Sequence, residues 1–311
     1  MSIRQAGLSW KGPLSVNAPP IWRVAVVGAA SQIGKALLPR LAAKGMVASR
    51  VGRAAAGEPA DGVTHVFDIQ RGCFQPELAS AEALISLAPL PTIDVVLHMA
   101  RALGARRVIA FGSTGRFSKL DSTSGLERDF AVQQQEAERL LASSCEVAGI
   151  AWTLFRPTMI YGADADLTVA FIKATIRKFG FFPVPWAARG LRQPVHVDDL
   201  AHACVAVLEC APSFNRAYNL GGADVLMFPE LVKRIFEAEG KRPLLLPVPR
   251  WLYGALLTVV AKLPAYAFVR REMMDRMYQN LTTDNTPARR DFGYSPRSFD
   301  PCGKSGVETL Q

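Results

Sequence analysis

The feature that most constrains the fold of this chain is a glycine-rich turn between a short hydrophobic run and an amphipathic helix. Arg23–Val27 is rich in valine and predicts a buried strand of a parallel sheet. Gly28, Ser31 and Gly34 follow in the pattern G-x-x-S-x-x-G, and Ile33–Leu41 carries apolar residues at helical spacing. In Rossmann folds such a strand, tight turn and helix N-terminus hold the pyrophosphate of a dinucleotide, and Ser31 is a candidate helix N-cap. We therefore predict cofactor contacts at Gly28, Ser31, Gln32, Ile33 and Gly34; the alternative is a Rossmann shell that has lost its cofactor.

The rest of the first half alternates between strands and helices. The predicted strands are 23–27, 47–49, 63–67, 83–87, 107–111 and 152–155. The predicted helices are 32–44, 76–82, 92–103 and 126–148. Units of about 30 residues in this order predict an α/β fold of the Rossmann type, with a doubly wound, parallel sheet of about six strands.

Prolines interrupt this alternation in the second half, which predicts a smaller C-terminal lobe that binds the substrate. With 311 residues, of which 50% are hydrophobic, the chain is long enough for both parts. We predict a flexible arm over residues 1–20, a dinucleotide-binding domain over 21–162 and the substrate-binding lobe over 163–311. Residues 191–210 are expected to return to the first domain.

The formal net charge of +9 suits nucleic acid, a membrane surface or an anionic small molecule as a partner. No cluster of lysines and arginines is interleaved with aromatic residues, so we expect no nucleic-acid partner. Five cysteines without a C-x-x-C pair favour reduced thiols and a cytoplasmic location. Four histidines without an H-x-x-x-H spacing or a carboxylate cluster predict no metal site.

An apolar helix is expected from Trp251 to Ala261, with cations near its ends at Arg250, Lys262 and Arg270–Arg271. The apolar stretch has about half of the roughly 20 residues that cross a bilayer, so no transmembrane segment is predicted. Because apolar residues cover all faces of this helix, we favour a core helix or a contact in a homodimer. Peripheral contact with an anionic membrane surface is the alternative.

A series of further motifs resembles the extended short-chain dehydrogenases, and among them the nucleotide-sugar epimerases and dehydratases. The resemblance covers about residues 22–300 and rests on the order of the motifs. After the glycine-rich turn come Asp68-Ile69, Leu87-Ala88-Pro89, Phe111-Gly-Ser113-Thr114, RPTMIYG from Arg156, RQPVHVDD from Arg192, and ARRDFGYSP ending at Pro296.

This resemblance implies roles for individual residues in cofactor binding. It places Asp68 at the adenine amino group, with Ile69 next in the chain. Alternatively, Asp68 is only a turn residue. It places Ala88 and Pro89, after Leu87, along the nicotinamide half of the cofactor.

The same resemblance implies the residues around the substrate. Ser113 is expected to be the catalytic serine, with Thr114 beside it. Arg192 is expected to bind the substrate diphosphate, because a planar guanidinium suits that group. His196 is a further candidate for substrate binding, although its flanking valines are more typical of a histidine packed within a sheet.

The chain departs from the family at the pair that handles the proton. The family carries Tyr-x-x-x-Lys at the start of the long helix, and alignment places Phe130 at the tyrosine and Gln134 at the lysine. Phenylalanine exchanges no proton and glutamine carries no charge, so the chemistry has either moved or been lost. The substitute candidates are Tyr161, which would otherwise be a packed aromatic residue, and Lys119 followed by Asp121, which would otherwise be solvated loop residues.

The cofactor type depends on the residues after the second predicted strand. No acid stands there to bind the adenosine ribose of NAD, and Arg50, with Arg53 as a second candidate, would pair with a 2′-phosphate. We therefore favour NADP over NAD. The leading hypothesis is an NAD(P)-dependent, epimerase- or dehydratase-like oxidoreductase that acts on a nucleotide-linked or phosphorylated sugar. The alternative is a catalytically degenerate sensor or scaffold that binds the dinucleotide.

Overall fold

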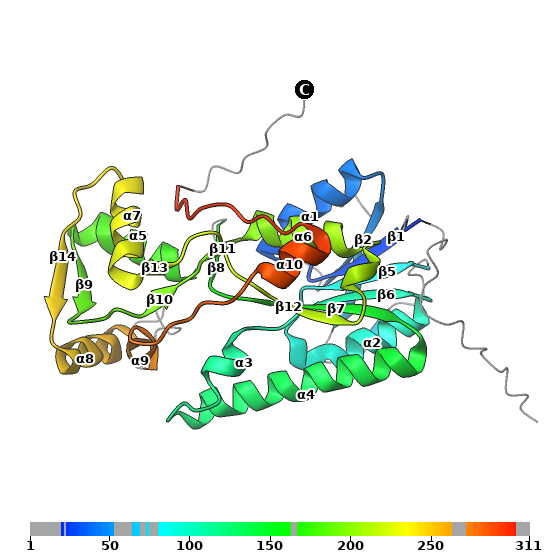
Figure 1. Ribbon diagram of the computed structural model, residues 1–311, viewed down its shortest axis with the longest axis horizontal. Helices are drawn as coiled ribbons and strands as arrows, with labels where there is room; N and C mark the ends of the chain where they lie inside the picture. Colours follow the sequence, from blue (N-terminus) through cyan, green and yellow to red (C-terminus); the bar gives the residue numbers. More distant parts are fainter. Residues whose placement is uncertain are drawn as a thin grey trace, which may run out of the picture.

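A central parallel sheet organises the molecule in the computed structural model, which describes residues 20–21, 23–52, 64–68, 73–74, 80–162, 167–262 and 272–302 (Figure 1). The strand order is β12-β7-β6-β5-β1-β2-β3-β4, and every neighbouring pair is parallel except β3 with β4. The bounds are β1 Arg23–Val27, β2 Val47–Gly52, β3 Thr64–Asp68, β4 Cys73–Phe74, β5 Ala83–Ser86, β6 Arg107–Phe111, β7 Ala151–Pro157 and β12 Arg216–Leu220. The predicted α/β fold of the Rossmann type is confirmed.

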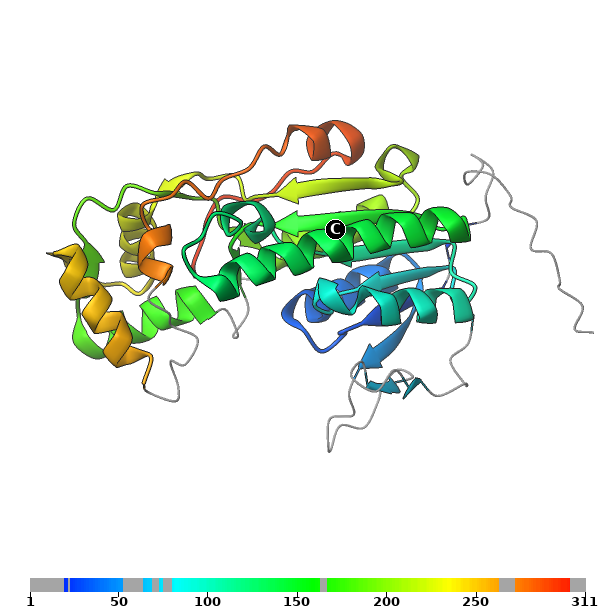
Figure 2. The same ribbon diagram turned by 90° about the horizontal axis from the view of Figure 1, so that it is seen from below.

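Helices cover both faces of this sheet, as Figures 1 and 2 show. On one face lie α1 (Gln32–Ala43), α6 (Val197–Val207) and α10 (Thr286–Phe292), and on the other lie α2 (Ile93–Ala102) and α4 (Gly125–Ala148). In β1, Val24 and Val26 pack into the first core and Ala25 and Val27 into the second. A strand that is buried on both faces explains the continuous apolar run that predicted it.

The second half of the chain forms a lobe at the far end of the molecule from β1–β3 (Figures 1 and 2). Its core is built from α5 (Leu167–Phe179), α7 (Phe228–Ala238), α8 (Arg250–Val260) and the parallel pair of β9 (Phe182–Pro185) with β14 (Leu245–Val248). Short pairs of strands connect the lobe to the sheet. They are β8 (Ile160–Tyr161) with β11 (Val195–His196) and β10 (Leu191–Arg192) with β13 (Leu226–Met227). The remaining elements are η1 (Leu90–Thr92), α3 (Gly115–Ser118), η2 (Ala211–Ser213) and α9 (Glu272–Arg276).

The structure corrects several sequence-based expectations. The sheet has eight strands rather than six, because β12 adds to its edge beside β7 and β4 pairs with β3. Of the helix predicted over 76–82, residues 80–82 are not helical, and 75–79 lie outside the described residues. Strand β2 continues to Gly52 instead of ending at residue 49, because Val51 pairs with Val27 and enters the core.

The apolar helix α8 is also different from the core helix that we favoured. Tyr253, Gly254 and Leu257 are buried, whereas Trp251 and Val259 are 74% and 63% exposed. The helix therefore packs on one side only. Among the residues that the structure describes, no helix combines the length and apolar character that crossing a bilayer requires.

Candidate functional site

The glycine-rich turn has the backbone that a pyrophosphate site needs. Gly28 takes a left-handed φ of +79°, and a Cβ on Gly34 would stand 2.3 Å from the Ala29 carbonyl oxygen, so α1 approaches the turn closely. Ser31 caps α1 as predicted, because its Oγ accepts a hydrogen bond from the Gly34 N–H at 3.1 Å. The N–H groups of Gln32 and Ile33 have no acceptor among the described residues. These two donors and the helix dipole suit an anion such as pyrophosphate.

This turn lies where the winding of the sheet reverses. Strand β1 leads through α1 to β2 on one side, whereas β5 pairs with its other side. A Cβ on Gly28 would stand 3.3 Å from the Leu87 Cβ and 3.6 Å from the Ala88 nitrogen, so the residues after β5 border the turn. Pro89 is exposed and caps η1. Ligands of doubly wound sheets bind in such a crevice, so the residues present fit a nicotinamide dinucleotide.

The structure describes only some of the residues predicted to contact the adenosine half of the dinucleotide. Arg50 lies inside β2, in register with Val26 and Thr64, rather than after the strand. It is half-buried, and its side chain has no hydrogen bond or ion pair among the described residues. The backbone of Asp68 ends β3, while Ile69 and Arg53 lie outside the described residues.

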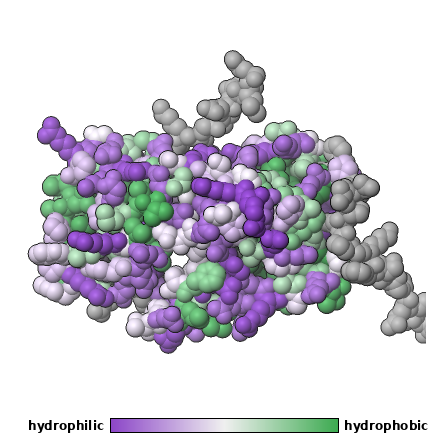
Figure 3. Space-filling view, viewed as in Figure 1, coloured by the Kyte–Doolittle hydropathy of each residue, from purple (hydrophilic) through white to green (hydrophobic). Residues whose placement is uncertain are grey.

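A cavity of about 700 Å³ lies between the sheet and the lobe. From the sheet side Ser113, Thr114 and Asn219 line it, and from the lobe Arg192 and Arg276. Apolar residues form much of the rest, and they are Phe117, Met159, Phe171, Ile172, Phe182, Phe228, Tyr253, Leu257, Met277 and Leu281. Figure 3 shows an apolar spot over α3, which carries the half-exposed Phe117 at this cavity.

The loop after β6 brings Ser113 and Phe130 together. Their side chains and that of Lys119 surround Gly115. A Cβ built on this glycine would lie 3.1 Å from Ser113 Oγ, 3.2 Å from Phe130 Cε1 and 3.5 Å from Lys119 Cε. Ser113 Oγ accepts a hydrogen bond from the Gly115 N–H at 3.0 Å, which leaves its own proton available to a ligand. Thr114 donates its hydroxyl to the Pro157 carbonyl at 3.1 Å. The phenyl ring of Phe130 therefore stands beside the serine, with the Lys119 ammonium 4.1 Å from its centroid.

One turn further along α4, Gln134 is 4% exposed and its Oε1 has no hydrogen-bond partner in the part of the chain that the structure describes. This oxygen lies 3.3 Å from the position of a Cβ on Gly112, at the carboxyl end of β6. Next to it, the buried Glu138 receives hydrogen bonds from Arg156 at 2.7 and 2.8 Å and from Arg116. An unpartnered, buried acceptor costs free energy unless a ligand or water satisfies it, so it marks this end of β6 as a place for a donor.

Two arginines give the cavity positive charge. Arg192 donates to the carbonyl oxygens of Leu191, Gln279 and Arg276 at 2.6 to 2.9 Å and has no carboxylate partner among the described residues. Burial, with the charge of Arg276 second, lowers its pKa to about 10, so it stays charged at neutral pH. Arg276 contacts Glu127 at 3.4 Å. Together with Lys119, these cations face the cavity, and no aspartate or glutamate is among the described residues that line it. The cavity therefore suits an anionic ligand with an apolar or planar part.

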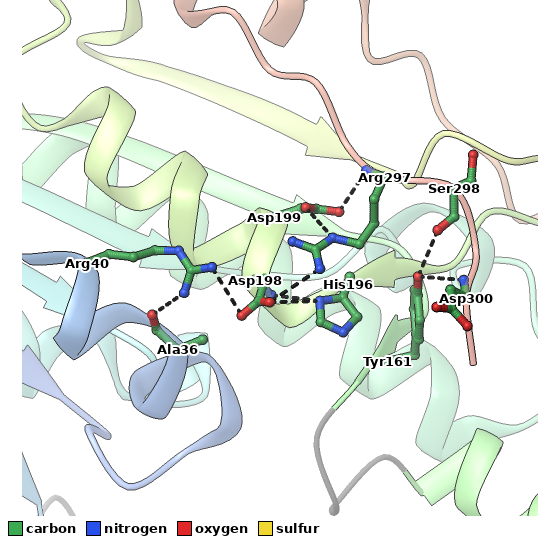
Figure 4. Close-up of polar contacts among 9 residues, drawn as sticks. All are labelled: Ala36, Arg40, Tyr161, His196, Asp198, Asp199, Arg297, Ser298 and Asp300. Carbon is green, nitrogen blue, oxygen red and sulfur yellow. Dashed lines mark hydrogen bonds and ion pairs between the residues drawn. The ribbon is translucent and has the colours of Figure 1, made fainter. Parts of the chain in front are cut away.

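Two of the predicted residues, Tyr161 and His196, are not among those that line this cavity. Figure 4 shows their polar contacts. Tyr161 is 1% exposed, donates to the Ser298 carbonyl and accepts from the Asp300 N–H, both at 3.3 Å. Burial raises its pKa to about 12, which opposes proton exchange near neutrality. His196 is buried beside it and accepts from the Asp198 N–H at 3.2 Å, and burial lowers its pKa. The structure gives both residues packing roles.

With this geometry in place, comparison with known proteins shows what the chain is similar to. Residues 90–221, less than half of the chain, match the model of the NAD dependent epimerase/dehydratase family. The chain is 22% identical over 178 residues to the UDP-glucose 4-epimerase of Vibrio cholerae, a match that covers 57% of this chain and 52% of that protein.

Two further known proteins are similar to this chain. It is 33% identical over 100 residues to NADH dehydrogenase [ubiquinone] 1 alpha subcomplex subunit 9, mitochondrial, of Arabidopsis thaliana, which covers 31% of this chain and 25% of that protein. The chain thus spans about half, and about a quarter, of the two curated relatives. The structure of a UDP-glucose 4-epimerase from Thermotoga maritima with UDP-glucose superposes with a TM-score of 0.65 at 18% identity, over 90% of this chain and 96% of that chain. At this identity the superposition shows a shared fold.

Sequence analysis missed part of the site. Arg276 belongs to a five-residue helix, and Asn219 belongs to β12, which was not predicted. Arg276 carries no local pattern. The signal for Asn219 was the short run Arg216–Leu220, whose residues alternate in burial.

Proposed function

We propose that this chain binds a nicotinamide dinucleotide on the Gly28–Gly34 turn and an anionic sugar nucleotide in the adjoining cavity, and that hydride passes between them. The observation that carries this proposal is the cavity at the carboxyl edge of the sheet, where Ser113 and the cations Arg192 and Arg276 converge. A bound dinucleotide would supply the hydride acceptor or donor. Arg192 and Arg276 would hold phosphate oxygens, and Ser113 would hold a sugar hydroxyl or carbonyl oxygen.

The finer proposal is that NADP binds better than NAD, because Arg50 lies in β2, Arg53 follows in the sequence, and residues 47–53 contain no acid. A charged hydrogen bond to a 2′-phosphate contributes about 1.5–3 kcal/mol, or roughly ten- to a hundredfold in affinity. Arg50→Ala should remove the preference if this residue provides the contact. Equal affinities of the parent protein for the two dinucleotides would refute the preference.

Gln32→Glu tests the dinucleotide site without harming the fold. An acid in the first turn of α1, which has none, is favourable for the helix dipole and unfavourable for a bound pyrophosphate. We expect the melting temperature to be kept and dinucleotide affinity to fall at least tenfold by calorimetry. Gln133→Glu makes the same charge change on the exposed face of α4 and should leave affinity unchanged. Unchanged affinity in Gln32→Glu would exclude this turn, and Gly28→Asp, which strains a tighter position, provides a second test.

A second candidate function is dinucleotide-dependent sensing or scaffolding without turnover. The favouring observation is Phe130, since the ring beside Ser113 holds no proton to exchange. Incubation with UDP-glucose and the dinucleotide separates the two functions when both absorbance at 340 nm and the sugar products are followed. A net change at 340 nm or a changed sugar supports hydride transfer, because an epimerase returns the hydride and leaves no net reduced cofactor. Binding of both ligands with neither change supports the scaffold.

A further inference from the structure

The outer face of α8 is an apolar surface that the fold leaves uncovered. Trp251, Leu252, Leu256 and Val259 are 74%, 41%, 40% and 63% exposed, and Ala255 between them is exposed as well. At 3.6 residues per turn, these five positions fall within an arc of roughly 140° on one side of the helix. The opposite side, with Tyr253 and Leu257, packs into the lobe.

A second exposed indole extends this surface. Trp186, directly after β9, is 69% exposed. Its backbone N–H donates to the carbonyl of Val248, which lies two residues before α8 begins. Leu244 and Leu246, next to and within β14, are 53% and 39% exposed. Two indoles and several aliphatic side chains expose on the order of several hundred Å² of apolar area, a size at which the largest patch of a monomer often serves binding. We call the side chains of Trp186, Leu246, Trp251, Leu252, Leu256 and Val259 the α8 face.

Cations border the α8 face, and acids are nearly absent from it. Residues 241–262 contain Lys241, Arg242, Arg250 and Lys262 and no aspartate or glutamate. Arg242, Arg250 and Lys262 are exposed, and Arg189 stands exposed three residues after Trp186. Asp275 contacts Arg250 at 2.6 Å and is the carboxylate that balances part of this charge.

The positive charge around the α8 face favours an anionic partner over a second copy of this chain. A second copy of this chain would bring the same cations against one another, in a protein that already carries a net charge of +9. An anionic lipid surface complements these cations, and indoles and aliphatic side chains enter the boundary between headgroups and acyl chains. We propose that the α8 face docks this chain on an anionic membrane surface, with α8 lying in the plane of the membrane.

This docking would bring the cavity close to the lipid. Tyr253 and Leu257, on the inner side of α8, line the cavity, so one helix of about 10 Å diameter separates the ligand site from the docked surface. Figures 1 and 2 both show α8 at the end of the molecule opposite β1–β3, where the sheet does not obstruct a flat surface.

Co-flotation of the full chain with vesicles tests the proposal. We expect binding to vesicles of phosphatidylcholine with phosphatidylglycerol, little binding to phosphatidylcholine alone, and release by high salt. Trp251→Asp with Val259→Asp, both at exposed positions, should keep the melting temperature and reduce binding at least tenfold. Val147→Asp, at an 84% exposed position near the end of α4, is the matched control and should bind as the parent does.

Three results would overturn the proposal. The first is a parent chain that does not float with anionic vesicles, and the second is a double variant that still floats as the parent does. The third is a parent dimer in solution that the double variant converts to a monomer, since the α8 face would then belong to a second copy of the chain. None of these results depends on dinucleotide binding or on turnover, so the proposed function is tested separately.

Discussion

At the scale of single residues, the position that matters most for chemistry is Phe130. Its ring stands next to Ser113, and Gln134 follows one turn later with an unpartnered Oε1. In the family that the chain resembles, tyrosine and lysine occupy these positions and exchange the proton. We expect Phe130→Tyr with Gln134→Lys to raise turnover of UDP-glucose by about 10²–10⁴-fold, measured from the sugar products together with absorbance at 340 nm.

The matched control is Phe130→Leu with Gln134→Met, which disturbs the same packing without adding a proton relay and should not raise turnover. A parent chain that already turns over at ordinary rates would contradict the expectation. In that case Lys119, whose ammonium lies against the Phe130 ring at the cavity, is the residue to replace first, and Lys119→Met should abolish activity.

Arg107, at the start of β6, is a fully buried cation without a carboxylate partner among the described residues. It donates to Thr153 Oγ1, the Val207 carbonyl and Ser213 Oγ, and desolvation lowers its pKa to about 9. Because the folded-state pKa lies below the unfolded value, the folded state loses its proton first as pH rises. The charge therefore destabilises the fold below about pH 9, and stability is regained between that pH and the unfolded pKa.

The test compares the parent with Arg107→Met from pH 8 to pH 10.5. The free energy of unfolding of the parent, minus that of the variant, should increase with pH by at most about 1.4 kcal/mol per unit. The subtraction removes the titration of tyrosines and lysines common to both proteins. A difference that is flat or falls with pH would show that Arg107 keeps its proton in the folded state.

At the scale of elements, the N-terminus of α6 connects α1 to the C-terminal segment (Figure 4). Asp198 contacts Arg40 and Arg297 at 3.3 Å each, and Asp199 accepts from Arg297 Nε at 2.9 Å and its N–H at 3.0 Å. Both carboxylates are nearly buried. Arg297→Met leaves one of them without a charged partner and should lower the free energy of unfolding by about 2–3 kcal/mol.

Arg250→Met is the control for this prediction, because its pair with Asp275 is exposed and should contribute less than about 1 kcal/mol. Urea unfolding followed by circular dichroism measures both variants. Equal losses in the two proteins would mean that the buried position of the Arg297 network has no special effect on stability.

At the scale of the whole molecule, the candidate ligands bind between the sheet and the lobe. A dinucleotide at 100 times its dissociation constant stabilises the fold by about 2.7 kcal/mol, which corresponds to roughly 5–10 °C in melting temperature. UDP-glucose should then add a further shift, because Arg192 and Arg276 from the lobe and Ser113 from the sheet would hold one molecule. Arg192→Met should lose the second shift, and Arg189→Met, at an exposed position, should keep it. A UDP-glucose shift that survives in Arg192→Met would place the anion elsewhere.

Local patterns carry much of the fold. The β1 strand, the turn and α1 are predictable because burial on both faces, a left-handed glycine and a serine cap are each encoded within a few residues. The same holds for β6, whose predicted and observed bounds coincide, and for α4, which ends at the left-handed Gly149. Ser113, Thr114 and Arg192 follow the order of motifs, and the structure places all three at the cavity.

By itself, the sequence determined the Rossmann architecture and the position of the glycine-rich turn, because these depend on local periodicity and residue identity. The departure at Phe130 and Gln134 rests on the resemblance and stays a prediction. The tertiary structure decided which distant residues meet. It brought Arg276 to Arg192 and buried Tyr161 against residues 298–300, and it left one face of α8 outside the core. Such contacts join residues that are 84 and 137 positions apart, and their partners are selected by the packing of whole elements rather than by any local pattern.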